Sequence, residues 1–415
     1  MPSDGQLARR LTLGDAVVIG LGSMIGAGVF ASFGPAAQAA GSGLLLGLAL
    51  AAAVAYANAT SSAQLAALYP QSGGTYVYGR ERLGPFAGYL AGVSFVVGKT
   101  ASLAAMALTF GAYAAPAFAR PIAAAAVVAL TAVNVAGVKK TAGLTRIIVI
   151  VVLTALIGVV VAALGGGSVA VGNLDGVFAA SPYGVLQAAG LLFFAFAGYA
   201  RIATLGEEVI EPERTIPKAI PRALGVTLIV YTVVALTALL AAGPDALAAS
   251  EAPLITAVEA GRFAALAPLV RVGATIAAAG VLLSLIAGVS RTSFAMARDG
   301  HLPAFLTRVH PTRGVPYLAE IVVGAVVVAL VLVVDLRGAI GFSSFAVLTY
   351  YGIANAAAVT LNGAERRWPR WIAIGGVIGC AVLALTLPIA SVMGGAALLA
   401  LGALAYLLRP DRSRA

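Results

Sequence analysis

Long apolar segments recur from one end of the chain to the other, separated by shorter stretches that carry glycine, proline and charged residues. Most of them approach or exceed the roughly 20 residues that an α-helix needs to cross a bilayer. They lack the alternation of apolar and polar positions that transmembrane strands require. The pattern predicts an all-α polytopic membrane protein with about 12 transmembrane helices. We expect spans at residues 14–36, 43–66, 85–114, 121–138, 145–164, 183–206, 220–242, 265–290, 317–334, 339–361, 369–388 and 390–408.

The composition supports a single membrane domain over residues 1–415. Of the 415 residues 61% are hydrophobic and only 10% are charged, and the mean hydropathy is +1.00. A soluble domain of this length would need more charge to cover its surface. No low-complexity linker divides the chain, and the only cysteine, Cys380, falls inside a predicted span, so no disulfide framework is expected.

The basic residues fall mainly on one side of the predicted membrane. With an even number of spans both termini lie on the same side, and 20 of the 26 lysine and arginine residues are on that side. Such an excess marks the cytoplasmic side. The net charge of +10 therefore reflects topology rather than nucleic-acid binding. We expect a bacterial inner-membrane protein with both termini in the cytoplasm.

Two spans are interrupted by glycine. The first span contains "GLGSMIGAGVF" at 20–30, and the sixth contains "LLFFAFAGYARIATLGEE" at 191–208. Each glycine inside a helix costs about 1 kcal/mol relative to alanine. The two stretches lie five spans apart, so the second copy enters the membrane from the opposite side. Paired interruptions of this kind indicate a transporter built from inverted repeats, although glycine also serves helix packing in membranes.

Four separated motifs carry a resemblance to a known family. They are "GLGSMIGAGVF" (20–30), "YPQSGGTYVYGRERLGPFAGYLAG" (69–92), "FFAFAGYARIATLGEEVIEPERTIPKAI" (193–220) and "SRTSFAMARDGHLP" (290–303). In this order they make the chain, over about residues 10–410, resemble the amino acid–polyamine–organocation (APC) permeases. The resemblance implies the LeuT fold: inverted five-helix repeats at 14–164 and 183–361, with helices 1 and 6 broken, and two additional helices at 369–408. It also implies secondary transport of amino acids by alternating access.

The resemblance further implies where the substrate binds. Backbone groups freed by a helix break persist in the hydrocarbon only where they line a cavity, and a half-helix presents positive N–H groups to an anion. A site with both freed N–H and freed C=O groups suits the zwitterion of an amino acid. The expected contacts are amides of Gly26, Ala27 and Gly28 to the carboxylate, carbonyls of Met24, Ile25, Phe194 and Ala197 to the amine, the Phe194 ring over the substrate, and Gly198 at the break.

Lys99 is a charged residue in the middle of the third span. A lysine at bilayer depth costs about 2.5–3.5 kcal/mol and should face a cavity or a partner. Several proton-coupled members of the family carry a lysine in the fifth span, and the matching position in this chain is at about Val152. We therefore expect Lys99 to carry the coupling proton or to bind the substrate. A structural lysine that bonds a carbonyl or extends to the membrane interface is the alternative.

Other polar residues bear on substrate and coupling. Lys99 and Arg201, without an acid at the same depth, favour a neutral amino acid, leave an acidic one open and disfavour organic cations or polyamines. Arg201 is expected to pair with Glu208, seven residues on along the same helix face. Glu207 and Glu208 are interpreted as part of a cytoplasmic ion-pair gate. An amino acid sensor that keeps the permease fold remains an alternative.

Sodium coupling has weak support in the sequence. Ser284 is the only hydroxyl between Thr275 and Ser290 in the eighth span, so a cation site there would have few ligands and proton coupling or exchange is favoured. His301 and His310 lie in a loop without cysteine or carboxylate at metal-ligand spacing. We expect no enzyme activity, no cofactor and no metal. Tyr350, Tyr351 and Asn355 in the tenth span are expected to line the site or its outer gate.

Overall fold

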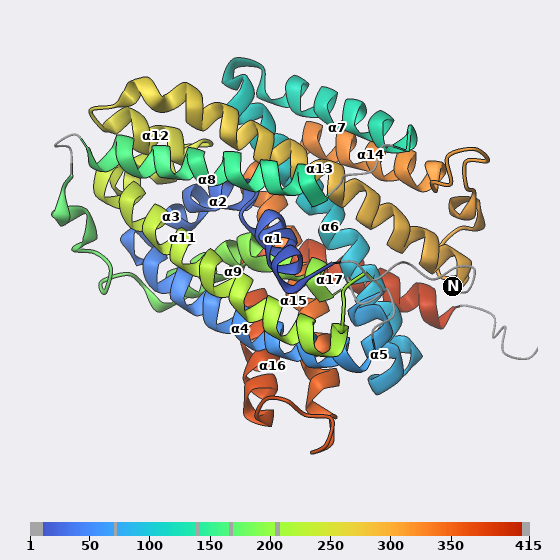
Figure 1. The fold of residues 1–415 in the computed structure, drawn as a ribbon. Helices are drawn as coiled ribbons and strands as arrows, with labels where there is room; N and C mark the ends of the chain where they lie inside the picture. Colours follow the sequence, from blue (N-terminus) through green and yellow to red (C-terminus); the bar gives the residue numbers. More distant parts are fainter. Residues whose placement is uncertain (1–10, 70–72, 138–141, 166–168, 204–207, 409–415) are drawn as a thin grey trace, which may run out of the picture.

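The computed structural model of the chain consists almost entirely of helices (Figure 1). It describes residues 11–69, 73–137, 142–165, 169–203 and 208–408. Within these ranges the β-type pairing is a single isolated bridge between Leu11 and Val209. The prediction of an all-α protein is confirmed.

Helices occur at every one of the twelve expected spans. Ten helical stretches are long and apolar enough to cross a membrane, and α14 and α16 are shorter apolar helices. The helices are α1 (Leu13–Met24), α2 (Ala27–Ala31), α3 (Phe33–Ala40), α4 (Leu44–Leu68), α6 (Pro85–Ala114), α7 (Ala119–Val135), α8 (Ala142–Leu164), α9 (Pro182–Phe196), η4 (Ala197–Tyr199), α10 (Ala200–Ala203), α11 (Pro212–Ala248), α13 (Ala267–Arg298), α14 (Tyr317–Val333), α15 (Leu336–Val359), α16 (Arg370–Leu385) and α17 (Ile389–Leu407).

Two short helices, α5 (Thr75–Leu83) and α12 (Pro253–Ala260), were not expected from the sequence. Both are too short to cross a bilayer. The polar run that begins at Arg80 makes α5 look like a loop in the sequence, and glycines with positive φ, Gly74 and Gly84, bound it on each side. Glycine adopts that backbone conformation without the steric cost that other residues meet. α5 packs against α6 and α15.

Helix α11 extends beyond its expected span, 220–242, at both ends. The earlier start includes Pro217 and Pro221, residues that ordinarily end or kink a helix. Ile216 and Ile220 are fully buried on the same turns, so the packing of this face offsets the loss of backbone hydrogen bonds. Near its other end, Gly243 has a φ of 78° and turns the chain between two helical segments.

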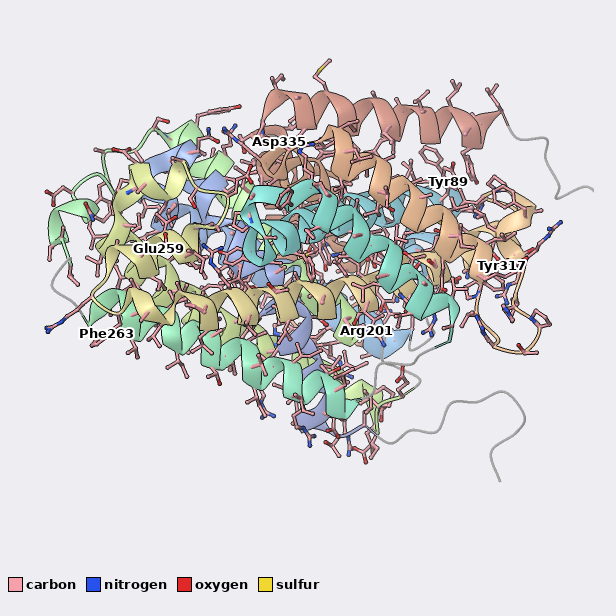
Figure 2. All side chains as sticks on the ribbon, turned by 90° about the horizontal axis from the view of Figure 1, so that it is seen from above. Tyr89, Arg201, Glu259, Phe263, Tyr317 and Asp335 are labelled. Atoms are coloured by element: carbon pink, nitrogen blue, oxygen red, sulfur yellow. The ribbon has the colours of Figure 1, made fainter. Side chains whose placement is uncertain are left out.

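The C-terminal helix lies outside the central bundle. α6 runs through the interior with most of its residues buried, and it packs against α13 and α15. In α17, by contrast, Ser391 and Gly395 are the buried residues, and the helix runs along one edge of the molecule (Figure 2). A site at the centre of the bundle is therefore built from the earlier spans.

Candidate functional site

Both glycine-rich spans are interrupted at the predicted residues. α1 ends at Met24 and α2 begins at Ala27, with non-helical backbone at Ile25 and Gly26 between them. The second interruption follows Phe196, where α9 gives way to the 3₁₀ turn η4 and then to α10. Each interruption leaves backbone carbonyl and amide groups without their regular helical partners, and these groups need other partners in a membrane.

The two interruptions lie against each other. A Cβ atom added to Gly198 would overlap the carbonyl oxygen of Ser23, and one added to Gly28 would lie 2.8 Å from Cα of Ala195. Contacts this close between backbones are possible only for glycine. The glycines that interrupt the first and sixth spans therefore also allow those spans to approach at the break.

Tyr231 of α11 joins the two interrupted spans. Its hydroxyl lies 2.5 Å from the carbonyl oxygen of Met24 and 3.0 Å from that of Ala195. One hydroxyl has a single proton to donate, so it cannot fully satisfy both carbonyls. The Met24 oxygen also accepts from the Gly26 amide at 2.7 Å, within the first interruption. Tyr231 was not predicted as a site residue, because an aromatic residue in the apolar run "LIVYTVVAL" is ordinarily a core residue.

Lys99 lies at the interruption of the sixth span. Its side chain is 9% exposed, and Nζ donates a hydrogen bond of 3.3 Å to the carbonyl oxygen of Ala197. The hydroxyl of Tyr351 donates to the same oxygen at 3.2 Å. Lys99 thus reaches a carbonyl that we expected to receive the substrate amine. This contact is also the one that the structural alternative for Lys99 requires.

The three residues of α15 that were expected to line the site have different surroundings. Tyr351 contacts η4, and its ring lies 4.9 Å from that of Tyr199. The hydroxyl of Tyr350 instead accepts a hydrogen bond from the Thr75 amide of α5 at 3.0 Å. Asn355 donates to the side-chain oxygen of Asn58 at 2.5 Å. Of the three residues expected to line the site, the structure places Tyr351 at the broken spans.

The expected ion pair between Arg201 and Glu208 is present, with 3.9 Å between nitrogen and oxygen. Arg201 lies on α10 (Figure 2), and its side chain is about half exposed. Glu207 lies outside the described residues. Leu11 forms backbone hydrogen bonds with Glu208 and Ile210 of the same segment, so the start of the first span and the end of the sixth are tied together.

The remaining candidates are Ser284 of α13 and the histidines of the loop that follows it. Ser284 is exposed, and its hydroxyl donates to the Gly280 carbonyl of its own helix at 3.0 Å. The cation site proposed there stays a prediction. His301 lies 3.1 Å from the Tyr76 hydroxyl. The described residues contain no group of three or more His, Cys, Asp or Glu side chains placed to hold a metal ion.

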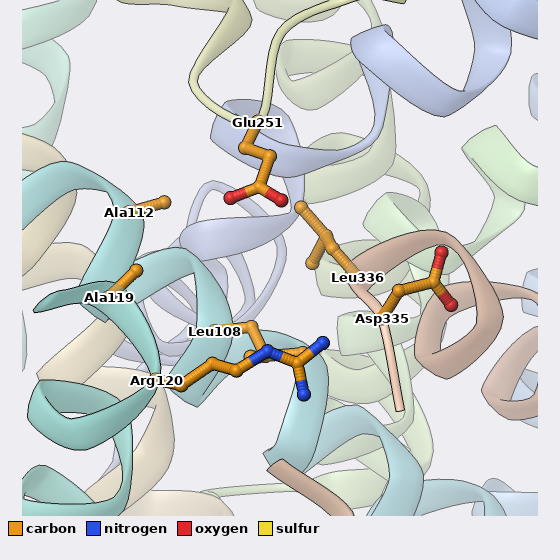
Figure 3. A pocket seen from close by; sticks show the side chains of 7 residues that line it. All are labelled: Leu108, Ala112, Ala119, Arg120, Glu251, Asp335 and Leu336. Atoms are coloured by element: carbon orange, nitrogen blue, oxygen red, sulfur yellow. The ribbon is translucent and has the colours of Figure 1, made fainter. Parts of the chain in front are cut away.

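A small cavity of about 30 Å³ lies further along α6 from Lys99 (Figure 3). Leu108 and Ala112 belong to its lining, and Leu108 is nine residues from Lys99, a rise of about 13 Å along a helix. Arg120, Glu251 and Asp335 complete its charged wall. The Arg120 guanidinium also donates to carbonyls at the end of α14. The residues that line the cavity do not belong to the interrupted spans, so the cavity is distinct from them.

The sequence analysis also overlooked Glu320 of α14. Its side chain is 3% exposed, and Oε2 has no hydrogen-bond partner among the described residues. An ionised carboxylate is costly to bury without a partner. A single acid four residues into an apolar helix looks like a first-turn residue in the sequence, and only the packing of α14 shows that it is enclosed.

A known protein family matches most of the chain. The family model described as "Amino acid permease" matches residues 15–361, which include both interrupted spans and Lys99. The chain belongs to the amino acid permease family. The resemblance seen in the sequence motifs is therefore confirmed, and the permease is a multi-pass membrane transporter and not an enzyme.

Relatives of the permease carry several names. It is 63% identical to a Mycobacterium tuberculosis protein named as an uncharacterized transporter, over 97% of this chain and 92% of the relative. It is 27% identical to the branched-chain amino acid permease of Bacillus subtilis, over 88% and 83% of the two chains. The methylthioribose transporter of the same organism is also 27% identical, over 86% and 82%.

Proposed function

We propose that the permease is a secondary transporter of neutral L-amino acids that works by alternating access on a LeuT-type scaffold. The observation that carries the proposal is the meeting of two interrupted helices in the bundle, where Tyr231 and Lys99 bond carbonyls of both interruptions. The name of the branched-chain relative supports a neutral cargo. The arrangement provides hydrogen-bonding backbone groups at a depth where water is scarce.

In this proposal the two charged ends of the cargo bind different backbone groups. The amides of Gly26, Ala27 and Gly28 bind the carboxylate, and carbonyls of both interrupted spans bind the amine. The carbonyls are those of Met24, Ile25, Phe194 and Ala197. The ring of Phe194, which is buried in this structure, covers the substrate. Gly198 keeps the two interruptions in contact.

Lys99 is the proposed coupling residue, and both termini are proposed to be cytoplasmic. The buried Lys99 is a lysine whose ammonium group bonds the Ala197 carbonyl at the second interruption. On the cytoplasmic side, Arg201 with Glu208 and Arg146 with Asp15 form the inner ion pairs, the latter at 2.8 Å. Breaking these pairs would accompany opening of the site to the cytoplasm.

Thermal stabilisation of the purified permease by each of the twenty amino acids, at pH 5.5 and 7.5, tests the proposal. A ligand that binds the folded state raises the apparent stability by an amount that grows with its concentration over Kd. We expect neutral amino acids to raise Tm and to compete with one another for uptake into proteoliposomes. If a polyamine or a cationic amino acid alone stabilises the protein, the assignment of a neutral cargo is wrong.

A further inference from the structure

The carbonyl oxygen of Ala197 has two donors in this structure. Lys99 and Tyr351 bond it at 3.3 and 3.2 Å. A carbonyl oxygen has two lone pairs, so these two donors use its ordinary acceptor capacity. In the proposed function, this same oxygen accepts from the ammonium group of the substrate. The Lys99 side chain therefore occupies a position that the cargo needs.

Among the described residues, Lys99 takes part in no ion pair that could hold two cations together. Tyr351 of α15 donates to the same Ala197 oxygen as Lys99, and the Tyr199 ring of η4 lies against the Tyr351 ring. The charged residues of the helices packed against α6 lie toward helix ends: Arg80, Glu81 and Arg82 in α5, Arg120 in α7, Arg271, Arg291 and Arg298 in α13, Glu320 in α14, and Arg337 in α15. Lys99 itself lies midway along the 30-residue α6.

Two positive charges in one low-dielectric site repel each other strongly. The repulsion between unit charges grows as the surrounding dielectric constant falls, so it is larger in a site with little water than in bulk solvent. A substrate ammonium that approaches the Ala197 oxygen therefore disfavours the protonated form of Lys99. The proton can leave to water when the site is open to one side of the membrane. The Nζ–H bond breaks, its electron pair stays on nitrogen, and the proton goes to solvent.

We infer that the substrate ammonium and the proton on Lys99 compete for the Ala197 carbonyl, so that the permease exchanges amino acid against proton. This inference rests on the proposed function and deepens it, because it fixes the sign of the coupling. Cargo binding releases a proton, and cargo release on the other side allows Lys99 to take one up. A symporter in which Lys99 must be protonated before the cargo binds would do the opposite.

Proton release on binding is the direct measurement. Purified permease in weakly buffered solution at pH 7.5, with a pH-sensitive dye, is mixed with L-leucine, or with the neutral amino acid that stabilises it most if L-leucine does not. By linkage, competition predicts release of up to about one proton per cargo bound, and tighter binding as the pH rises. Proton uptake on binding overturns the inference. So does an unchanged dye signal at a cargo concentration that saturates the thermal shift of the protein.

Two substitutions at Lys99 separate competition from a structural role. Lys99→Met removes the competing cation and should bind cargo with an affinity that no longer depends on pH between 5.5 and 8.5, with no proton released. Lys99→Arg carries a permanent charge. It should bind about tenfold or more weakly than Lys99→Met at every pH. If Lys99→Arg binds normally and Lys99→Met does not, the cation assists binding and the inference is wrong.

The failure of the proposed function gives a different result. If none of the twenty amino acids stabilises either the natural protein or Lys99→Met, the amino acid assignment fails and the competition with it. If amino acids bind both proteins and no proton moves, the transporter assignment stands and the competition alone is overturned. The measurement on the natural protein decides even where a variant folds poorly, and a thermal melt of each variant establishes whether it folds.

Discussion

At the scale of single residues, close backbone contacts at glycine and one tyrosine hydroxyl determine how the interrupted spans meet. Gly198 and Gly28 allow backbone to touch backbone, and Tyr231 places one hydroxyl proton between two carbonyl oxygens. These features depend on a few atoms each. Small substitutions should therefore have large effects, and each can be compared with a matched substitution elsewhere in the chain.

Gly198→Ala should destabilise the permease and abolish transport. The new Cβ would overlap the Ser23 carbonyl, so the two spans must move apart, and overpacking of this kind typically costs about 1–3 kcal/mol. Gly225→Ala is the control, because no atom lies within 4 Å of its added Cβ in α11. Its Tm should stay the same or rise. Equal behaviour of the two variants in thermal melts and uptake would contradict the close contact.

Tyr231→Phe should lower transport and stability, since it removes the hydroxyl donor that the buried carbonyls of Met24 and Ala195 share. Loss of a partner for a buried polar group costs about 1–3 kcal/mol. Tyr78→Phe is the control: Tyr78 is equally buried, and its hydroxyl has no hydrogen-bond partner among the described residues. That variant should melt at or above the temperature of the natural protein. A larger effect at Tyr78 than at Tyr231 would argue against the bridging role.

At the scale of elements, ion pairs and hydrogen bonds outside the spans hold the short helix α5 against the bundle. Arg82 of α5 forms a 2.6 Å ion pair with Glu365 in the segment after α15. The Arg82 guanidinium and the Asn362 amide lower the pKa of the Glu365 carboxyl below its ordinary value. Tyr76 of the same helix donates to Asp299 at 2.5 Å, and burial together with this carboxylate raises the pKa of the Tyr76 hydroxyl.

Glu365→Gln should lower Tm at neutral pH by an amount that disappears in acid. Because the pKa of Glu365 is lower in the folded state, its contribution is present above the ordinary pKa of about 4.3 and is lost as the pH falls through the folded value. Glu81→Gln, on the same helix in an exposed pair with Arg80, should change Tm little at any pH. A difference from the natural protein that does not shrink as the pH falls from 7 into the acid range would assign the effect to packing.

The elements differ in how well the sequence predicted them. The spans followed from their length and hydrophobicity, and both interruptions followed from glycine, since each signal is local. Helices α5 and α12 were missed because a short helix with charged residues has the composition of a loop. The partners of Lys99 and the role of Tyr231 could not be predicted, because they depend on how α6, α11 and α15 pack around η4.

At the scale of the whole molecule, the chain forms a bundle of membrane-spanning helices with loops at two opposite ends. The excess of lysine and arginine in one set of loops predicts which end faces the cytoplasm. The native Cys380 is 2% exposed and should not react with a thiol reagent applied in water. The natural protein is therefore a suitable background for introduced cysteines.

Introduced cysteines should establish the orientation. Phe178→Cys, at a position 88% exposed between η3 (Val171–Leu174) and α9, should react with a membrane-impermeant maleimide in intact cells. Val309→Cys, in the segment after α13, should react only after the membrane is permeabilised. The natural protein should stay unlabelled in both conditions. The reverse pattern would place both termini outside the cell.

The position of Lys99 at the middle of α6 has an electrical consequence. If its proton crosses the membrane in exchange for a zwitterion, every turnover moves one net positive charge against the direction of cargo movement. A voltage of 100 mV acts on that charge with about 2.3 kcal/mol. In a cell whose interior is negative, the voltage draws the proton inward and the cargo outward. The permease would then work as an exporter, and the sign of the current in a voltage-clamped bilayer would show it.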